Sequence, residues 1–363
     1  MNLNRIVLKD MDYIIENLSL KEKNCFKGSN ILITGCAGFL GYYFINFFTS
    51  KMDCLGINSI IGLDNFKLGK ADWIHNIAKE NSNLKIYNFD ITKDNIENIE
   101  GTENCNLIIH MASIASPIFY RQYPIETLDA NIWGLRNLLD FYKNKNIKGF
   151  LFFSSSEIYG NPTYEFIPTS EEYNGNVSPL GPRACYDESK RFGETMCYLF
   201  SNQYNMPITI ARPFNNYGPG MKLDDQRVPA DFAKAVFENR DIVMFSDGSP
   251  TRTFCYIADA IIGYLKVLTY GKFDYFNIGI DTPEISIKEL ADIYVDKAKK
   301  IFGHECNAQF QISSDKDYLT NNPARRCPDI SKAKTTLMYN PSIDVETGVE
   351  RFLEYIKINN GEL

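Results

Sequence analysis

Residues 30–41, Asn-Ile-Leu-Ile-Thr-Gly-Cys-Ala-Gly-Phe-Leu-Gly, decide the fold. They begin with an apolar run typical of a buried strand, and glycines follow at positions 35, 38 and 41. In this spacing Gly35 permits a tight turn, Gly38 lets a pyrophosphate approach the backbone, and Gly41 lets the next helix pack on the strand. The N-terminus of that helix then faces the phosphates. The stretch therefore predicts a strand, a turn and a helix that together bind a dinucleotide.

Apolar runs typical of buried strands recur along the chain, with helical sequence such as residues 42–50 and 68–81 between them. The strand-like runs are residues 30–34, 60–64, 84–89, 107–111, 150–154 and 208–211. Strands that alternate with helices predict the α/β class, with a doubly wound parallel sheet of the Rossmann type.

The sequence divides into three parts. Residues 1–28 carry apolar residues at helical spacing, and we expect this N-terminal extension to form a short helix packed on the outside. Residues 29–214 are expected to form the Rossmann domain. Beyond about residue 215, turns rich in Gly, Pro and Asn separate shorter elements. We expect residues 215–363 to form mainly a smaller C-terminal α/β lobe that binds the substrate and covers the carboxyl ends of the strands.

The composition excludes several classes of protein. A net charge of -7 without a block of Lys and Arg argues against nucleic-acid binding. No apolar run approaches the roughly 20 residues of a membrane-spanning helix. The nine cysteines lack C-x-x-C pairs and predict reduced thiols in a cytoplasmic protein, and the three histidines lack metal-ligand spacing. We therefore expect a cytoplasmic protein without a membrane segment or a metal site.

The acidic residue that the glycine fingerprint requires is Asp64, at the end of the second strand run. Its carboxylate would accept hydrogen bonds from ribose hydroxyls and repel a 2′-phosphate, so NAD is expected rather than NADP. The alternative is that Asp64 is only a turn residue at a strand end. The other expected cofactor contacts are Phe39, Leu40, Asn65, Asp90 and Ile91, of which the last two are expected to lie under the adenine.

A tyrosine and a lysine lie one helical turn apart. Tyr186 and Lys190 are at positions i and i+4, so both project from one face of a helix. A free tyrosine has a pKa near 10 and is a poor base at neutral pH. We expect a nearby ammonium group and the positive nicotinamide ring to lower that pKa, which would make Tyr186 a catalytic base. The alternative is a solvated helix face.

Polar residues also follow the strand run at 150–154. Ser155, Ser156 and Glu157 lie at its carboxyl end, where an α/β sheet presents its chemistry. The two hydroxyls can complete the hydrogen bonding of a substrate hydroxyl that is being oxidised, and Glu157 is expected to act as an acid or base or to hold water. The alternative for Glu157 is a structural role such as capping.

An anionic substrate requires a local cluster of basic groups in this acidic protein. Arg227, Arg252, Arg325 and Arg326 are the candidates, because guanidinium groups bind phosphate and carboxylate in bidentate fashion. We expect at least two of the four to lie in the site.

The chain resembles the extended short-chain dehydrogenase/reductase family of nucleotide-sugar epimerases, dehydratases and decarboxylases. Within that family it is most similar to the UDP-glucuronate decarboxylases. The stretches that carry the resemblance are Met111–Pro117, Ser154–Pro162, Gly181–Arg191, Pro250–Phe254 and Arg326–Ile330. The resemblance implies an NAD-dependent enzyme that acts on a nucleotide-diphosphate sugar.

The resemblance also implies roles for individual residues. Tyr186 would take the proton of the sugar C4 hydroxyl, and Glu157 and Arg252 resemble the acid/base and carboxylate-facing residues of decarboxylases. The residues that match substrate-binding positions are Ser116, Asn215, Arg227 and Arg326, the last three of which would hold the nucleotide diphosphate. A homodimer through helices within residues 125–142 and 186–198 is likewise implied.

Three other functions remain open at this point. A nucleotide-sugar 4-epimerase needs the same NAD, Tyr186 and Lys190 as a decarboxylase. A 4,6-dehydratase is disfavoured, because Ser156 stands where that branch carries aspartate. A catalytically silent NAD-binding sensor would be expected to have lost the tyrosine or the lysine, and this chain retains both.

Overall fold

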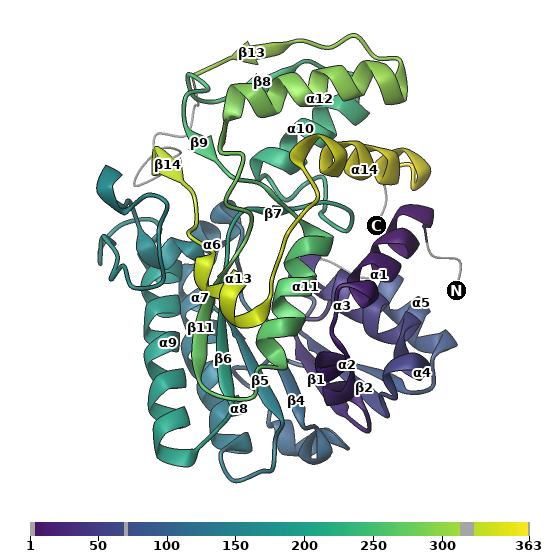
Figure 1. Cartoon of the computed structure of the whole chain (residues 1–363), viewed down its shortest axis with the longest axis vertical. Coiled ribbons are helices and arrows are strands. Elements are labelled where there is room, and N and C mark those ends of the chain that lie inside the picture. The colour runs from purple at the N-terminus through teal and green to yellow at the C-terminus, as the bar shows by residue number, and fades with distance from the viewer. Residues whose placement is uncertain (1–3, 69–71, 313–322, 362–363) are drawn as a thin grey trace.

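A seven-stranded sheet forms the lower half of the molecule in Figure 1. The structure, a computed structural model, describes residues 4–68, 72–312 and 323–361. The strands run in the order β11-β6-β5-β4-β1-β2-β3, and all neighbours pair in parallel. Their bounds are β1 Asn30–Thr34, β2 Ser59–Asp64, β3 Leu84–Asn88, β4 Leu107–His110, β5 Gly149–Phe153, β6 Ile208–Pro213 and β11 Asp274–Ile278. The strand order reverses between β1 and β4, which is where α/β sheets bind ligands.

Helices cover both faces of the sheet, as the alternating side chains of β1 require. Ile31 and Ile33 belong to a core with α3 and α11, whereas Leu32 belongs to a second core with α8 and α9. Strands buried on both faces are apolar along their whole length. The helices around the sheet are α3 Phe39–Ser50, α4 Met52–Leu55, α5 Asp72–Glu80, α6 Pro117–Gln122, α7 Pro124–Asp129, α8 Leu135–Tyr142, α9 Ala184–Tyr204 and α11 Ile257–Leu268. The doubly wound parallel sheet is therefore confirmed.

Short helical segments link these elements. They are η1 Ile96–Asn98, η2 Thr102–Asn104, the π-helical η3 Ala130–Gly134, η4 Ser156–Tyr159 and η5 Tyr164–Phe166. The helix expected at residues 68–81 corresponds to α5, and residues 69–71 lie outside the described part of the chain.

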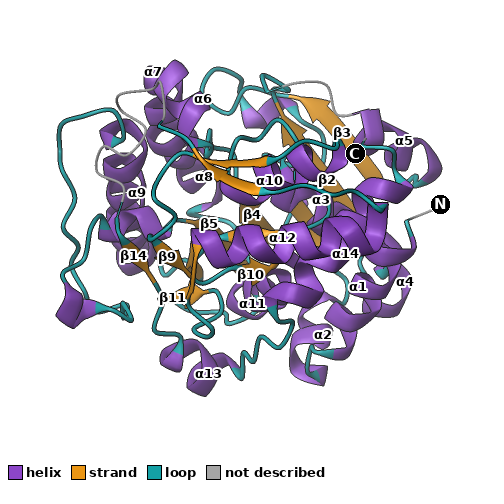
Figure 2. Cartoon of the chain, turned by 90° about the horizontal axis from the view of Figure 1, so that it is seen from above, coloured by secondary structure: helices purple, strands orange, loops and turns teal. Residues whose placement is uncertain are grey.

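A second set of elements lies above the carboxyl ends of the strands (Figures 1 and 2). Its helices are α10 Val228–Phe237, α12 Ile287–Phe302 and α14 Val345–Ile358. Its strands form three small sheets and are β7 Asn216–Tyr217, β8 Ile242–Met244, β9 Thr251–Arg252, β10 Cys255–Tyr256, β12 Ile285–Ser286, β13 Ala308–Phe310 and β14 Arg325–Arg326. These elements supply the upper wall of the cavity described below.

The chain after residue 214 also returns to the large sheet, which the sequence did not predict. Strand β11 pairs with β6, and α11 and α13, Ser331–Leu337, pack beside it. The buried Asn277 in β11 made this strand hard to recognise. Its amide donates to Thr169 O at 2.9 Å and to Asp329 O at 3.0 Å, and its Oδ1 accepts from Tyr159. A buried polar group with all its partners in place is compatible with a core strand.

The N-terminal extension contains two helices, α1 Arg5–Glu16 and α2 Leu20–Phe26, rather than the single outer helix that the sequence suggested. Residues 1–3 lie outside the described part of the chain. Helix α1 packs on α3, α11 and α14, to the right in Figure 1. Val7, Met11 and Ile14 are fully buried in the main core. The extension is therefore part of the folded core.

The buried Asp10 ties α1 to three other elements. Its Oδ2 accepts hydrogen bonds from Tyr43 at 2.7 Å and Tyr256 at 2.6 Å, and its Oδ1 accepts one from Arg351 at 2.9 Å. Burial raises the pKa of Asp10 to about 6, although these partners oppose the rise. Asp10 thus links α3, β10 and α14 through one carboxyl group.

We predict that Met11→Ala lowers the free energy of unfolding by about 2–5 kcal/mol, the range for truncating a buried large side chain. Leu8→Ala is the matched control, because Leu8 lies on the same helix and is 43% exposed. It should cost well under about 1 kcal/mol. Urea unfolding of both variants measures this, and equal, small losses would show that α1 is not part of the core.

Candidate active site

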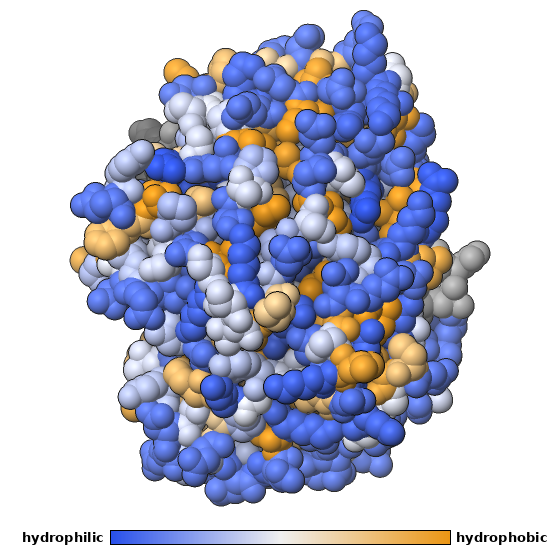
Figure 3. Space-filling view, in the orientation of Figure 1, coloured by the Kyte–Doolittle hydropathy of each residue, from blue (hydrophilic) through white to orange (hydrophobic). Residues whose placement is uncertain are grey.

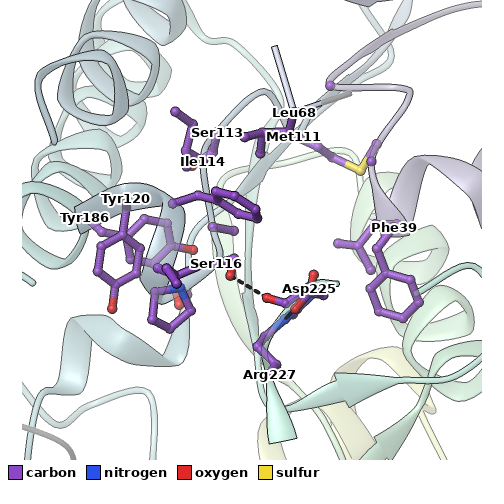
Figure 4. Close-up of a pocket in the computed structure, with 18 of the residues that line it drawn as sticks. Phe39, Leu68, Met111, Ser113, Ile114, Ser116, Tyr120, Tyr186, Asp225 and Arg227 are labelled. Atoms are coloured by element: carbon purple, nitrogen blue, oxygen red, sulfur yellow. Dashed lines mark hydrogen bonds and ion pairs between the residues drawn. The ribbon is translucent and has the colours of Figure 1, made fainter. Parts of the chain in front are cut away.

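A cavity of about 860 Å³ lies between the carboxyl ends of the sheet and the second set of elements (Figure 4). Apart from Arg325, the residues that the sequence predicted for the cofactor, the substrate or the chemistry line this cavity. These residues are Gly35, Gly38, Phe39, Leu40, Gly41, Asp64, Asn65, Asp90, Ile91, Ser116, Ser155, Ser156, Glu157, Tyr186, Lys190, Asn215, Arg227, Arg252 and Arg326. The fold therefore gathers residues that are up to 291 positions apart in sequence around one cavity.

The glycine turn forms one end of the cavity. Gly35 has a φ of +71°, and a Cβ there would lie 2.7 Å from the backbone nitrogen of Ala112. Gly38 precedes the first residue of α3 and carries no side chain that could cap it. The turn thus leaves the N-terminus of α3 open to the cavity. This geometry fits a pyrophosphate at a helix N-terminus.

Asp64 lies at the end of β2, beside the turn. Its two oxygens accept hydrogen bonds from the backbone nitrogens of Ala37 and Phe66, both at 2.9 Å. Burial raises the pKa of Asp64, and these two hydrogen bonds oppose the rise.

The hydroxyls of Ser113 and Ser154 are buried and have no hydrogen-bond partner among the described residues. Polar groups of this kind can be satisfied by a bound ligand.

Tyr186 and Lys190 lie in α9, as the sequence predicted, and face the middle of the cavity. The Lys190 ammonium donates to Phe153 O at 2.7 Å and lies 5.7 Å from the centre of the Tyr186 ring. Burial raises the pKa of Tyr186 to about 12, and a hydrogen bond with Ser155 opposes this. Burial lowers the pKa of Lys190 to about 7. The protein groups around Tyr186 do not by themselves lower its pKa, because desolvation outweighs them. The expected lowering by Lys190 together with a nicotinamide ring stays a prediction.

Tyr120 is a neighbour of Tyr186 that the sequence analysis missed. The two side chains lie next to each other in Figure 4. Their rings stack with centres 5.2 Å apart and an angle of 12° between their planes. Tyr120 is 1% exposed, and its hydroxyl has no hydrogen-bond partner among the described residues. Its position in α6 fixes one side of the Tyr186 ring.

Glu157 lies in η4, directly after β5, and forms ion pairs with two arginines. It accepts a hydrogen bond from Arg326 Nη2 at 2.7 Å and further bonds from Arg326 Nη1 and Arg183 Nη2. Burial alone would raise the pKa of Glu157, but Arg326 and Arg183 outweigh it and hold the value at about 2. Arg183 was missed as a site residue, although it lies in the stretch Gly181–Arg191 that carried the resemblance.

Three of the four candidate arginines line the cavity. Arg252 donates to Pro323 O at 2.6 Å and to Thr251 O at 2.8 Å. Arg325 instead pairs with Glu284 at 2.6 Å and does not line it. Arg227, Arg252 and Arg326 thus line the cavity, and their binding of an anionic substrate stays a prediction.

The remaining substrate candidates surround the loop before α10. Arg227 pairs with Asp225 through Nη2 and Oδ2 at 2.8 Å and lies 5.7 Å from the centre of the Phe39 ring. Ser116 donates to Asp225 O at 2.8 Å, the dashed line in Figure 4. Asn215 donates to Thr253 O at 2.9 Å. This loop therefore brings Arg227 close to the glycine turn.

Three further observations concern features outside the cavity wall. His110 is buried, and its Nδ1 lies 2.7 Å from the Thr34 hydroxyl; burial lowers its pKa to about 3. Hydrophilic residues cover most of the face shown in Figure 3. Among the described residues, none of the helices is both long enough and apolar enough to span a bilayer.

Comparisons with known proteins identify the family. The sequence profile of the NAD dependent epimerase/dehydratase family matches residues 31–279. The chain is 35% identical to UDP-glucuronic acid decarboxylase 1 of Xenopus tropicalis, over 90% of this chain and 72% of the relative. It is 32% identical to UDP-glucuronic acid decarboxylase 6 of Arabidopsis thaliana, over 91% of this chain and 90% of the relative.

Solved structures share the fold. UDP-glucuronic acid 4-epimerase of Bacillus cereus, determined with UDP-glucuronic acid and NAD, superposes with a TM-score of 0.73 at 24% identity. The match covers 91% of this chain and 99% of the epimerase. The profile match, the two relatives and the glycine turn with Tyr186 and Lys190 lead to one conclusion: the chain belongs to the NAD dependent epimerase/dehydratase family.

Proposed function

We propose that the protein decarboxylates a nucleotide-linked glucuronic acid, with UDP-glucuronate as the first candidate, through a 4-keto intermediate. The observation that carries this proposal is the cluster of Arg183, Arg252 and Arg326 around Glu157, in the same cavity as Tyr186. Guanidinium groups at the sugar end of the site suit a sugar that carries a carboxylate. The relatives named as UDP-glucuronic acid decarboxylases support the choice of substrate.

The residues that would hold NAD are the glycine turn, Asp64, Asn65, Asp90 and Ile91. The open helix N-terminus suits the pyrophosphate, and the carboxylate of Asp64 suits the ribose hydroxyls. When bound, NAD supplies a hydride acceptor for the sugar C4 and a hydride donor afterwards.

Tyr186 is the proposed base. It takes the proton of the C4 hydroxyl as that carbon is oxidised, and Ser155 and Ser156 orient the sugar. The pKa of about 12 shows that the buried phenol alone favours its neutral form. Positive charge at Lys190 and at a bound nicotinamide ring would stabilise the phenolate. Lys190 is therefore proposed to favour loss of the Tyr186 proton through its positive charge, and Tyr186 itself is the base.

Oxidation at C4 turns the uronic acid into a β-keto acid. The bond between C5 and the carboxyl carbon then breaks, its electron pair forms an enolate with the C4 carbonyl, and carbon dioxide leaves. Arg252 is proposed to face the sugar carboxylate before this step. The low pKa of Glu157 keeps it ionised, so it enters the reaction as a proton or hydrogen-bond acceptor. The enolate then takes a proton at C5 from water, and Tyr186 returns its proton to the C4 oxygen when C4 is reduced again.

The substrate's nucleotide diphosphate is proposed to lie along Ser116, Asn215 and Arg227. Arg326, which the sequence analysis grouped with them, pairs with Glu157. We therefore assign Arg326 to the sugar end of the site. Residues 215–363 are proposed to supply part of this substrate wall, and the division into 1–28, 29–214 and 215–363 stays a prediction. α11, β11 and α13 return to the large sheet.

A 4-epimerase acting on the same uronic acid is the second candidate. It would use the same Tyr186, and the arginine cluster would bind the same carboxylate. The two functions differ in whether the carboxyl group is lost, so the product separates them.

We predict that incubation with UDP-glucuronate releases carbon dioxide and yields a nucleotide-linked pentose without net consumption of NAD. Mass spectrometry of the product distinguishes the outcomes. A product of unchanged mass with altered retention would replace the decarboxylase with the epimerase.

Tyr186→Phe should lower turnover by about 10²–10⁴-fold, the range for removing a general base. No transient NADH absorbance should appear, because the first oxidation fails. Tyr198→Phe is a matched control on the same helix, since Tyr198 is 51% exposed and does not line the cavity. Wild-type turnover in Tyr186→Phe would remove this residue from the mechanism.

We also predict that the purified protein carries NAD(H) rather than NADP(H). Acid release followed by mass spectrometry identifies the nucleotide. Asp64→Ala should raise the affinity for NADP relative to NAD, because it removes the charge that opposes a 2′-phosphate. Asp53→Asn, an exposed substitution on α4, is the control. Recovery of mainly NADP from the wild type would contradict the assignment.

A homodimer in the cytoplasm is the proposed working form. Phe192 and Leu199 on α9 are 50% and 55% exposed, and Trp133 in η3 is 57% exposed, whereas Met196 is buried. Exposed apolar residues on neighbouring elements support an interface there. Sedimentation should find a dimer at micromolar concentration and a monomer for Phe192→Glu with Leu199→Glu. A monomeric wild type would refute this.

A further inference from the structure

Arg183, the residue before α9, lies between an aromatic ring and two carboxyl groups. Its guanidinium carbon is 6.0 Å from the centre of the Tyr120 ring. One nitrogen bonds Glu157, and Nε lies 3.5 Å from Oδ2 of Asp187. The side chain of Arg183 is 13% exposed. Three neighbours therefore restrict the position of this guanidinium group.

Asp187 lies one helical turn after Arg183 and directly follows Tyr186. Its side chain is 7% exposed, and its Oδ1 is buried with no hydrogen-bond partner among the described residues. Asp187 does not line the cavity, so it reaches the site only through its neighbours. A nearly buried carboxyl group with one unsatisfied oxygen is costly for stability, which favours a functional role.

The two carboxyl groups beside Arg183, those of Asp187 and Glu157, differ in how readily they ionise. Burial and the negative charge of Glu157 raise the pKa of Asp187 to about 7, and Arg183 and Arg326 oppose the rise. Glu157 stays ionised, with a pKa of about 2. Tyr120, Tyr186 and Cys185 are further titratable groups near this point, and all three are neutral near pH 7 because burial raises their pKa values.

We propose that Arg183 is a positioning residue for Glu157, and that Asp187 holds Arg183 and sets the net charge that the cluster presents to an anionic sugar. The inference rests on the proposed function and extends it to Asp187, which does not line the cavity. Arg183 fixes the direction of the Glu157 carboxylate. When Asp187 is protonated, Glu157 is the one negative charge beside the guanidinium groups of Arg183, Arg252 and Arg326. When Asp187 is ionised, its own carboxylate adds a second.

The sign of the pH effect follows from this arrangement. Below about pH 7 Asp187 is protonated, and the cluster has its greatest positive charge. As the pH rises through that value, Asp187 ionises and the attraction for a sugar carboxylate weakens. The affinity for a nucleotide glucuronate should therefore fall several-fold across this interval. The affinity for the matching neutral nucleotide hexose should stay nearly constant.

The electrostatic interaction of Asp187 with Glu157 and Arg183 can be tested by titrating Asp187, which does not depend on turnover. In protein labelled with ¹³C at the aspartate carboxyl carbon, the signal absent from Asp187→Asn identifies Asp187. Its midpoint should lie near pH 7 in the wild type. Glu157→Gln should lower it by removing a negative neighbour, and Arg183→Gln should raise it by removing a positive one. A midpoint near 4 in all three proteins would overturn the proposal.

Kinetics with UDP-glucuronate test the effect on the site. Asp187→Asn should retain activity and lose the rise in KM above pH 7. Arg183→Gln should lower kcat while NAD binding is kept, and Arg183→Lys should restore part of it. Arg191→Gln, on the same helix but outside the cavity, should leave the pH profile unchanged. An Asp187→Asn enzyme with the wild-type pH profile would overturn the proposal.

The two experiments separate this inference from the proposed function. If the wild type does not act on UDP-glucuronate, the proposed function fails. The shifts of the Asp187 midpoint in Glu157→Gln and Arg183→Gln still support the positioning role. If UDP-glucuronate is decarboxylated and these shifts are absent, the function stands and the positioning role fails.

Discussion

The ion pair between Glu157 and Arg326 joins the two halves of the molecule at the site. Glu157 follows β5 of the large sheet, whereas Arg326 lies in β14 of a small sheet in the upper wall. Their side chains are 18% and 10% exposed, so the pair is desolvated on both sides. A buried ion pair offsets this cost only with bidentate geometry and further partners, which Arg326 and Arg183 provide. This contact joins the upper wall to the sheet beside Tyr186.

Contacts far from the site hold the upper wall in place. Strand β11 brings the chain back to the large sheet, and Asn277 ties that strand to Thr169 and Asp329. On the other side, Asp10 links α1 to α14 through Arg351. These contacts explain why residues that are distant in the sequence keep a fixed distance across the cavity.

The local parts of the site could be predicted from the sequence. The glycine turn depends on spacing within seven residues, and the Tyr186–Lys190 pair depends on one helical turn. The strands up to β6 were recognisable because burial on both faces makes them continuously apolar. Their boundaries agree with the expected runs to within two residues, which is the usual uncertainty of element ends.

Features that depend on long-range contacts could not be predicted. Arg183 gives no signal of its own, since its role arises from Glu157 and Tyr120, which other elements supply. The high pKa of Tyr186 reflects its burial, whereas spacing alone indicated only the nearby ammonium group. β11 was missed because its polar residues gain their partners only in the folded chain. Spacing in the sequence therefore predicts which neighbours lie within a helical turn or a tight turn. It does not predict how deeply a side chain is buried in the folded protein.

The most direct test is a crystal structure of the protein with NAD and UDP-glucuronate bound. The account predicts the pyrophosphate at the turn from Gly35 to Gly41 and the sugar C4 hydroxyl within hydrogen-bond distance of Tyr186. It also predicts the sugar carboxylate among Arg252, Arg326 and Glu157. A sugar bound with its carboxylate turned to solvent, away from these arginines, would contradict the account.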